Sequence, residues 1–251
     1  MRKPLIAGNW KMHTTISDAI NLANGIKREL IDFNKVDILL CPPFTALSSV
    51  YEVIMDTNIK LGAQNIAWEK EGAYTGEISS IMLKDCGCKF AIIGHSERRK
   101  YFGESDEMVN KRIKAALAGG VTPIVCVGET LEERERDLTT KVIAKQLEGG
   151  LSDLSEDEAN KIIIAYEPVW AIGTGKTATP QQAQEIHKFI RTWVSDKISH
   201  PCASSLRILY GGSVKPDNIR ELMNEEDIDG GLVGGASLKV DSFTEIVKNS
   251  V

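Results

Sequence analysis

Glu167 is the residue whose setting most clearly suggests chemistry. It follows residues 162–165, an apolar and largely β-branched run of the kind found in parallel strands that are covered on both faces. Pro168 cannot donate a ladder hydrogen bond and therefore marks the exit from the sheet. A carboxylate at this point, beside a loop longer than most strand-to-helix connections, is a candidate general base under a lid.

The loop after Glu167 ends where a helix is expected to begin. Thr179 is a typical N-cap, Pro180 suits the first helical position, and Gln182 completes a capping box. Within the loop, Gly173 supplies a backbone N–H group that a ligand can approach closely. We therefore expect Gly173 to contribute to an anion site.

Three further polar residues also follow short apolar runs. Asn9 and Lys11 come after the first run of the chain, and His95 comes after the run at residues 90–93. Taken singly, Lys11 would be a solvated lysine and His95 a partly buried histidine. Because His95 begins a short helix, the positive end of the helix dipole disfavours an imidazolium, and we expect a neutral ring that donates a hydrogen bond.

Two glycine-bearing turns follow the last two apolar runs. One contains Gly211, Gly212 and Ser213, and the other contains Gly234 and Gly235. Each could be an ordinary tight turn. Together they offer backbone N–H groups to an anion, and a phosphate site after strands 7 and 8 is a recurring feature of α/β barrels.

Eight apolar runs alternate with helical patterns along the whole chain. Their spacing of about thirty residues, without a flexible linker, predicts an α/β protein with a single-domain (β/α)8 barrel of eight parallel strands over residues 1–251. A doubly wound open sheet is the second possibility, although residues 8–11 lack its glycine-rich phosphate loop. The expected strands are residues 5–8, 36–41, 59–63, 90–93, 121–127, 162–165, 206–210 and 228–233.

Charge, cysteine content and the lengths of the apolar runs argue against several classes of protein. The net charge of −5 and the pI near 5.5, without a basic cluster, argue against nucleic acid or an anionic membrane as the main partner. Five cysteines, an odd number, favour reduced thiols, and Cys86 with Cys88 lacks a second pair at metal-binding spacing. No signal peptide or membrane span is recognised, so we expect a cytoplasmic protein.

The candidate residues define one type of reaction. No metal ligands are recognised, and residues 170–177 fail the Walker A pattern because Trp170 replaces its first glycine. A base, an electrophile and a cation around a phosphate pocket then indicate metal-free proton abstraction next to a carbonyl, through an enediolate. One well-aimed donor to the developing oxyanion contributes about 3–4 kcal/mol.

Six segments, in order from the first strand to the last helix, carry longer motifs: residues 7–12 (AGNWKM), 73–77 (AYTGE), 92–99 (IIGHSERR), 166–175 (YEPVWAIGTG), 210–214 (YGGSV) and 232–238 (LVGGASL). In this order they resemble the triosephosphate isomerase family. The resemblance implies interconversion of dihydroxyacetone phosphate and D-glyceraldehyde 3-phosphate, in glycolysis and gluconeogenesis, without a cofactor. It implies that Glu167 moves the proton, that His95 is the electrophile, that Asn9 and Lys11 bind substrate, and that Gly173, Ser213, Gly234 and Gly235 contact the phosphate.

The same resemblance implies a homodimer. In the family the third loop, here running from Gln64 to Ser79, inserts into the neighbouring subunit. Thr75 would then lie beside the partner's Asn9 and Lys11. This role would account for a connection that is long and has no helical or strand periodicity.

Two other functions remain open from the sequence. A barrel that acts on another phosphorylated sugar is one, but a Schiff-base aldolase needs a lysine in the middle of a barrel strand, whereas Lys11 lies at a strand end. The other is a catalytically inactive barrel used as a binding or adhesion protein. The presence of Lys11, His95 and Glu167 together disfavours this second alternative.

Overall fold

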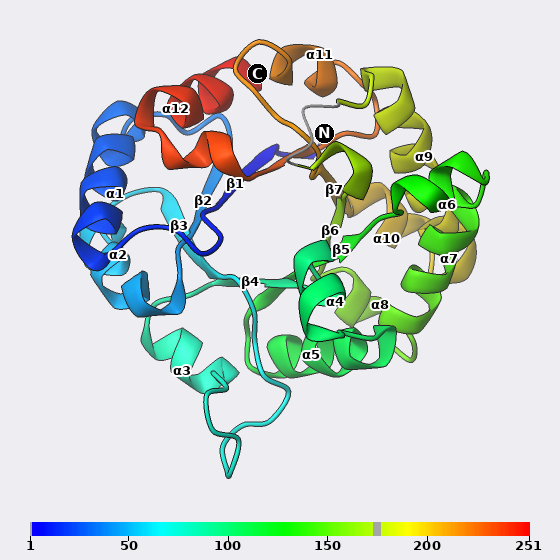
Figure 1. Ribbon diagram of the computed structural model, residues 1–251, viewed down its shortest axis with the longest axis horizontal. Helices are drawn as coiled ribbons and strands as arrows, with labels where there is room; N and C mark the ends of the chain where they lie inside the picture. Colours follow the sequence, from blue (N-terminus) through cyan, green and yellow to red (C-terminus); the bar gives the residue numbers. More distant parts are fainter. Residues whose placement is uncertain (1, 173–176) are drawn as a thin grey trace.

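The computed structural model describes residues 2–172 and 177–251, and its centre is a closed barrel of eight parallel strands (Figure 1). β1 pairs with β2 on one side and with β8 on the other, which closes the sheet and excludes a doubly wound open sheet. The predicted (β/α)8 barrel is confirmed. The strands are β1 (Leu5–Asn9), β2 (Asp37–Cys41), β3 (Ile59–Ala63), β4 (Phe90–Ile93), β5 (Thr122–Val127), β6 (Ile163–Tyr166), β7 (Arg207–Tyr210) and β8 (Gly230–Val233).

Helices form a ring outside the strands (Figure 1). Several connections carry two helical pieces where the sequence pattern indicated one helical stretch, because N-cap residues such as Ser105 and Ser155 start a second helix. The helices are α1 (Ile16–Leu30), α2 (Leu47–Ile54), α3 (Ser80–Asp85), α4 (Ser96–Phe102), α5 (Asp106–Ala118), α6 (Leu131–Glu135), α7 (Thr139–Gly150), α8 (Glu156–Ala159), α9 (Pro180–Lys197), α10 (His200–Ser205), α11 (Ile219–Met223) and α12 (Val240–Asn249), with the 3-10 helices η1 (Phe44–Ala46), η2 (Val169–Ala171) and η3 (Gly235–Leu238).

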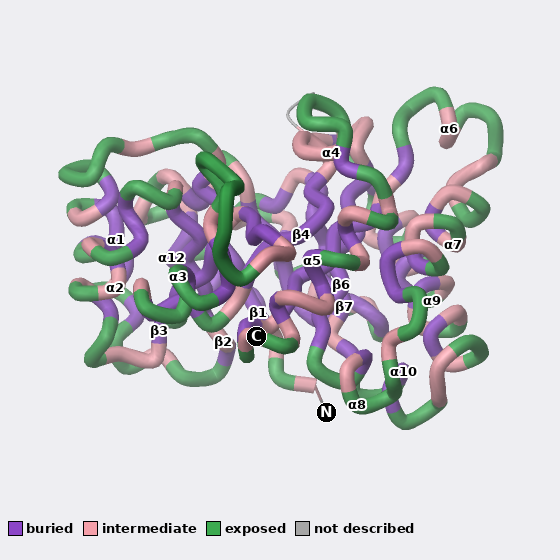
Figure 2. The backbone as a smooth tube through the Cα atoms, turned by 90° about the horizontal axis from the view of Figure 1, so that it is seen from below, coloured by how far each residue is buried: buried purple, intermediate pink, exposed green. Residues whose placement is uncertain are grey.

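Alternate residues of the strands fill two separate parts of the core. In β1, Leu5 and Ala7 belong to the cluster inside the barrel, whereas Ile6 packs in the larger cluster between the strands and the helices. Figure 2 shows the buried strands enclosed by helices whose outer surfaces are exposed. Both faces of the sheet are therefore covered, which is why the strands have few polar residues.

The connection from β6 to α9 carries the predicted base. Thr179 caps α9 through the predicted capping box, and Pro180 is the first residue of the helix. The predicted irregular loop contains η2, so regular structure returns earlier than the sequence indicated. Gly173 lies outside the described residues.

Residues 64–79 contain no helix or strand, as predicted. This segment connects β3 with α3 and projects away from the barrel in Figure 1. Among the described helices, none combines the length and apolar character needed to cross a bilayer.

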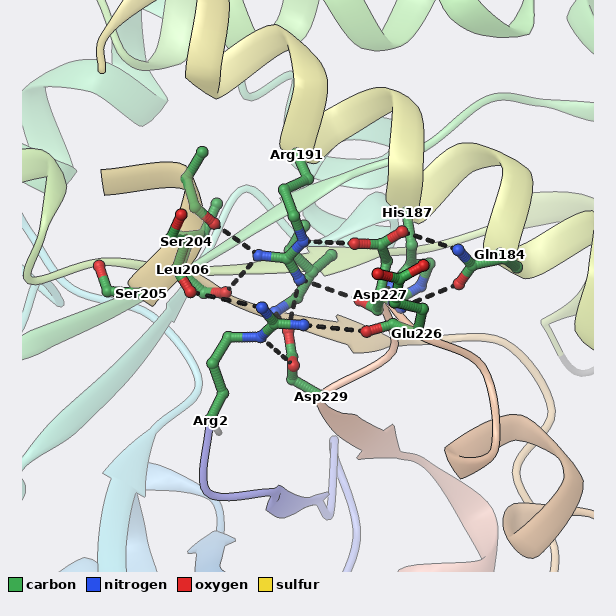
Figure 3. Close-up of polar contacts among 12 residues, drawn as sticks. Arg2, Gln184, His187, Arg191, Ser204, Ser205, Leu206, Glu226, Asp227 and Asp229 are labelled. Carbon is green, nitrogen blue, oxygen red and sulfur yellow. Dashed lines mark hydrogen bonds and ion pairs between the residues drawn. The ribbon is translucent and has the colours of Figure 1, made fainter. Parts of the chain in front are cut away.

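A charged network lies at the amino ends of the strands (Figure 3). Arg191 from α9 contacts Asp227 and Asp229, which precede β8, at 2.5 and 2.8 Å. Arg2, which precedes β1, pairs with the other oxygen of Asp229 at 2.5 Å. The network therefore ties the first and last strands to an outer helix.

Candidate functional site

A cavity of about 300 Å³ lies at the carboxyl ends of the strands. In a parallel barrel these ends all face one rim, so residues far apart in sequence meet there. Its lining includes every predicted site residue that the structure describes: Asn9, Lys11, His95, Glu167, Ser213, Gly234 and Gly235. The cavity is also lined by Ile172, Gly211, Gly212, Val214, Lys215, Leu232 and Ala236.

Hydrogen bonds fix both the backbone and the carboxylate of Glu167. Its N–H donates to the carbonyl of Val127 at 2.8 Å, which continues the pairing of β5 and β6 past the strand ends. One carboxylate oxygen accepts from the Ser96 N–H at 2.9 Å, and the other lies 2.8 Å from Nε2 of His95. Burial alone would raise the pKa of Glu167, but His95 and these hydrogen bonds lower it below its ordinary value, so the carboxylate is ionised.

His95 is the N-cap residue of α4, as the sequence predicted. The preceding Gly94 has a φ of +72°, and an added Cβ would lie 2.8 Å from Val109, so only glycine turns the chain comfortably there. Nδ1 accepts from the Glu97 N–H at 3.2 Å, which leaves the single proton of a neutral ring on Nε2, facing Glu167.

The charge of His95 depends on opposing effects. Burial lowers the pKa of the ring, but the Glu167 carboxylate and its hydrogen bond outweigh burial and raise that pKa above its ordinary value. The prediction of a neutral ring was based on the helix dipole alone and did not take the Glu167 carboxylate into account. The Glu97 N–H favours the neutral ring because an Nδ1 that accepts a hydrogen bond has no proton.

Lys11 has a left-handed backbone conformation, with a φ of +54°. This conformation is uncommon outside glycine and is often found at functional sites. The Lys11 N–H donates to Oδ1 of Asn9 at 3.1 Å, and the Lys11 carbonyl accepts from Nε2 of Gln64 at 2.8 Å. Nζ pairs with Glu97 at 2.5 Å and lines the cavity, so the turn presents the ammonium to a ligand.

The turns after β7 and β8 line the same cavity, with Gly211 beside Glu167 and Gly234 beside Lys11. An added Cβ at Gly235 would meet open space, and one at Gly234 would meet only the end of Lys11. Gly235 begins η3, where an N–H group has no acceptor within the helix. The turn after β8 therefore combines free space with a backbone donor, as an anion site requires.

Comparisons with known proteins agree with this geometry. The family model described as "Triosephosphate isomerase" matches residues 4–250. Curated relatives named triosephosphate isomerase are 58% identical over 250 residues in Endomicrobium trichonymphae and 56% identical over 251 residues in Carboxydothermus hydrogenoformans, with all of both chains covered. The relative of the same name in Geotalea uraniireducens is 56% identical over 250 residues, again over all of both chains.

The chain belongs to the triosephosphate isomerase family. It is an isomerase that interconverts dihydroxyacetone phosphate and D-glyceraldehyde 3-phosphate, as the sequence predicted. The alternative of a catalytically inactive binding or adhesion barrel is not favoured. The glycolytic role follows from the family.

Some residues of the triosephosphate isomerase site were not assigned from the sequence. The Ser96 N–H holds Glu167, but a backbone contact leaves no signal in the residue type. Gly211 faces the base, since a Cβ there would lie 2.9 Å from Cγ of Glu167. Glu97 pairs with Lys11 at 2.5 Å. Burial raises the pKa of the Cys126 thiol well above its ordinary value.

Among the described residues, no three His, Cys, Asp or Glu side chains are grouped as ligands of a metal ion would be. The groups that the cavity offers are an ionised carboxylate, an imidazole, an ammonium and backbone amides. These groups can move protons and bind anions.

Proposed function

We propose that Glu167 is the base that moves the proton between the two carbons of the triose phosphate. Its carboxylate would take a proton from the carbon beside the carbonyl and return it to the neighbouring carbon. The observation that carries this proposal is the 2.8 Å contact between Glu167 and Nε2 of His95 within one cavity. A substrate carbonyl that enters between them would replace the carboxylate as the acceptor of the His95 N–H.

In this mechanism His95 and Lys11 stabilise the enediolate. The Nε2–H of His95 would donate to the substrate oxygen as negative charge develops, and the Lys11 ammonium would offset that charge. Asn9, which is buried beside Lys11 and accepts its N–H, would bind substrate and maintain the turn. The proton removed from one carbon returns to the other, and the hydroxyl proton of one substrate oxygen passes to the neighbouring substrate oxygen, both of which lie beside Nε2 of His95 in this mechanism. The reaction therefore needs no oxidant and no external acid.

The phosphate would bind at the turns that follow β7 and β8. We assign this role to Ser213, Gly234 and Gly235, whose turns line the cavity, and to Gly173 from the sequence motif. Backbone N–H groups bind a phosphate without the loss of side-chain entropy. Residues 1–251 would act as one catalytic domain, because the site draws on β1, β4, β6, β7 and β8.

A homodimer is the proposed assembly. The segments that follow β1 to β4 carry large exposed apolar side chains, an arrangement typical of an interface. Residues 64–79 would insert into the second subunit, with Thr75 near its site. The exposed side chains are Met12, Phe44, Tyr74, Met82, Tyr101 and Phe102.

A cytoplasmic location is the final part of the proposal. All five cysteines are unpaired, which suits a reducing compartment. The glycolytic family to which the chain belongs supports the same location.

The role of Glu167 can be tested with Glu167→Asp, which withdraws the carboxylate by one methylene. We expect kcat to fall about 100-fold while KM changes little, because misplacing the base affects the transition state more than binding. A coupled assay of glyceraldehyde 3-phosphate consumption, with a chelator present, measures both constants. The same change at the exposed Glu245 is the control, and equal effects on kcat and KM, or none, would contradict the assignment.

The dimer can be tested with Thr75→Arg, which adds a bulky cation where the partner's Lys11 is expected. We predict that dimer affinity and activity fall together, because the charge cannot be accommodated in the interface. Light scattering across protein concentrations and the coupled assay measure the two quantities. Thr140→Arg, on the exposed surface of α7, is the control, and a fully active monomer would refute the proposal.

A further inference from the structure

Gln146, on α7, makes two hydrogen bonds to the backbone of one residue. Its Oε1 accepts from the Gly128 N–H at 2.8 Å, and its Nε2 donates to the Gly128 carbonyl at 3.0 Å. Gly128 follows directly after β5. Because both polar groups of Gly128 are held by one side chain, the amide restrains the position and the orientation of this strand end.

Gly128 in turn packs against the backbone of Glu167. The flanking bonds join the Glu167 N–H to Val127 at 2.8 Å and the Val169 N–H to Glu129 at 3.1 Å, and Gly128 lies between them. A Cβ on Gly128 would lie only 1.8 Å from the Glu167 carbonyl oxygen. The two backbones are therefore in direct contact, and a displacement of Gly128 would move Glu167.

We propose that Gln146 is a positioning residue of the isomerase, which fixes Gly128 and thereby the backbone from which Glu167 reaches the substrate. This inference rests on the proposed role of Glu167 as the base. Gln146 does not line the described part of the substrate cavity; it lines a second cavity of about 310 Å³ that also reaches Glu167 and Gly128. Loss of the amide would therefore affect the placement of the base and not the phosphate contacts.

Gln184, on α9, provides a matched comparison at the opposite end of the barrel. Its Oε1 accepts from the Asp227 N–H at 3.0 Å, and its Nε2 donates to the Asp227 carboxylate at 2.7 Å (Figure 3). Gln184 thus also holds one residue through both atoms of its amide, although one of the two bonds goes to a side chain, and it does not line the described part of the substrate cavity. If Gln146 contributed only to stability, substitution of either glutamine would lower stability and leave kcat unchanged.

The test compares Gln146→Met with Gln184→Met in the full chain. Methionine keeps the length of the side chain and removes both hydrogen bonds. We expect Gln146→Met to lower kcat roughly 10-fold with KM within about twofold, because a small displacement of a base slows proton transfer more than binding. We expect Gln184→Met to leave kcat unchanged per folded molecule, although urea denaturation will show a loss of stability in both variants.

A second variant covers the case in which Gln146→Met fails to fold. Gln146→Glu keeps an oxygen that accepts the Gly128 N–H but sets its second, negatively charged oxygen against the Gly128 carbonyl, so we expect kcat to fall at least as far as in Gln146→Met. Normal kcat in the folded Gln146 variants, or an equal loss in Gln184→Met, would overturn the inference. Glu167→Gln in the same assay separates the two proposals. If this variant retains full activity, the assignment of Glu167 as the base is wrong. If it is inactive while the Gln146 variants keep a normal kcat, only the proposed role of Gln146 is wrong.

Discussion

At the amino ends of the strands Arg191 lies between two carboxylates, whereas at the carboxyl ends Glu167 lies between an imidazole and a backbone amide. All five N–H groups of Arg191 are used. Nε and Nη2 reach Asp227 and Asp229, and Nη1 donates to the carbonyls of Ala203 and Leu206 at 2.7 and 2.8 Å. No donor of this guanidinium remains for a ligand.

The groups at the carboxyl ends have fewer partners and line a cavity. Within residues 2–172 and 177–251, Lys11 has one ion pair, with Glu97, and Nε2 of His95 lies 2.8 Å from the Glu167 carboxylate. The comparison shows that buried charges serve different purposes at the two ends of the barrel. A saturated network stabilises the closed sheet, whereas an unsaturated network keeps its charges available for chemistry.

Removing a cation from the carboxyl ends is the most severe test of this difference. We predict that Lys11→Met lowers kcat/KM about 1,000-fold, because the substrate loses a charged donor. The free energy of unfolding will change by less than about 1 kcal/mol, since the ion pair with Glu97 is partly exposed. Steady-state kinetics and urea denaturation measure the two effects, and a large loss of stability would break the comparison.

The same substitution at the amino ends should have the opposite result. Arg191→Met leaves two largely buried carboxylates without their shared cation, so we expect the free energy of unfolding to fall by about 3–5 kcal/mol. The folded fraction will retain its kcat and KM. Activity lost in proportion to the folded fraction agrees with this prediction, whereas a change in KM at full folding contradicts it.

A smaller effect concerns the buried His187, which contacts the same network. Its Nδ1 lies 3.2 Å from the Asp227 carbonyl, and burial lowers its pKa to about 3. The unfolded chain therefore takes up a proton near pH 6.5 that the folded chain does not, and stability falls as the pH drops below that value. In His187→Gln, we predict that the decrease in unfolding free energy between pH 7 and 5.5 is smaller by about 1 kcal/mol.

The pH dependence of His187→Gln can be measured by urea denaturation at several pH values. Replacement of the exposed His200 by glutamine is the control and should leave the pH profile unchanged. A profile of His187→Gln that is parallel to that of the natural chain would show that His187 titrates normally in the folded protein.

The sequence alone predicted the barrel, with an open sheet as the second possibility, and the polar residues that line its rim. Alternating apolar runs and helical patterns are local properties, so β3 and β4 have their predicted bounds and α9 has its predicted cap. Because parallel strands must end on one rim, the positions of His95 and Glu167 after strands were enough to predict that they meet. The family motifs then indicated the reaction.

Only the tertiary structure decided which atoms meet and how they affect one another. The contact between His95 and Glu167, which sets the direction of both pKa shifts, depends on the orientation of two side chains from different strands. The left-handed turn at Lys11 accepts a hydrogen bond from Gln64, and the Glu167 backbone packs against Gly128, which Gln146 holds. Such contacts join residues that are distant in the chain, and their geometry follows from the closure of the barrel and the packing of its helices, which no local pattern specifies.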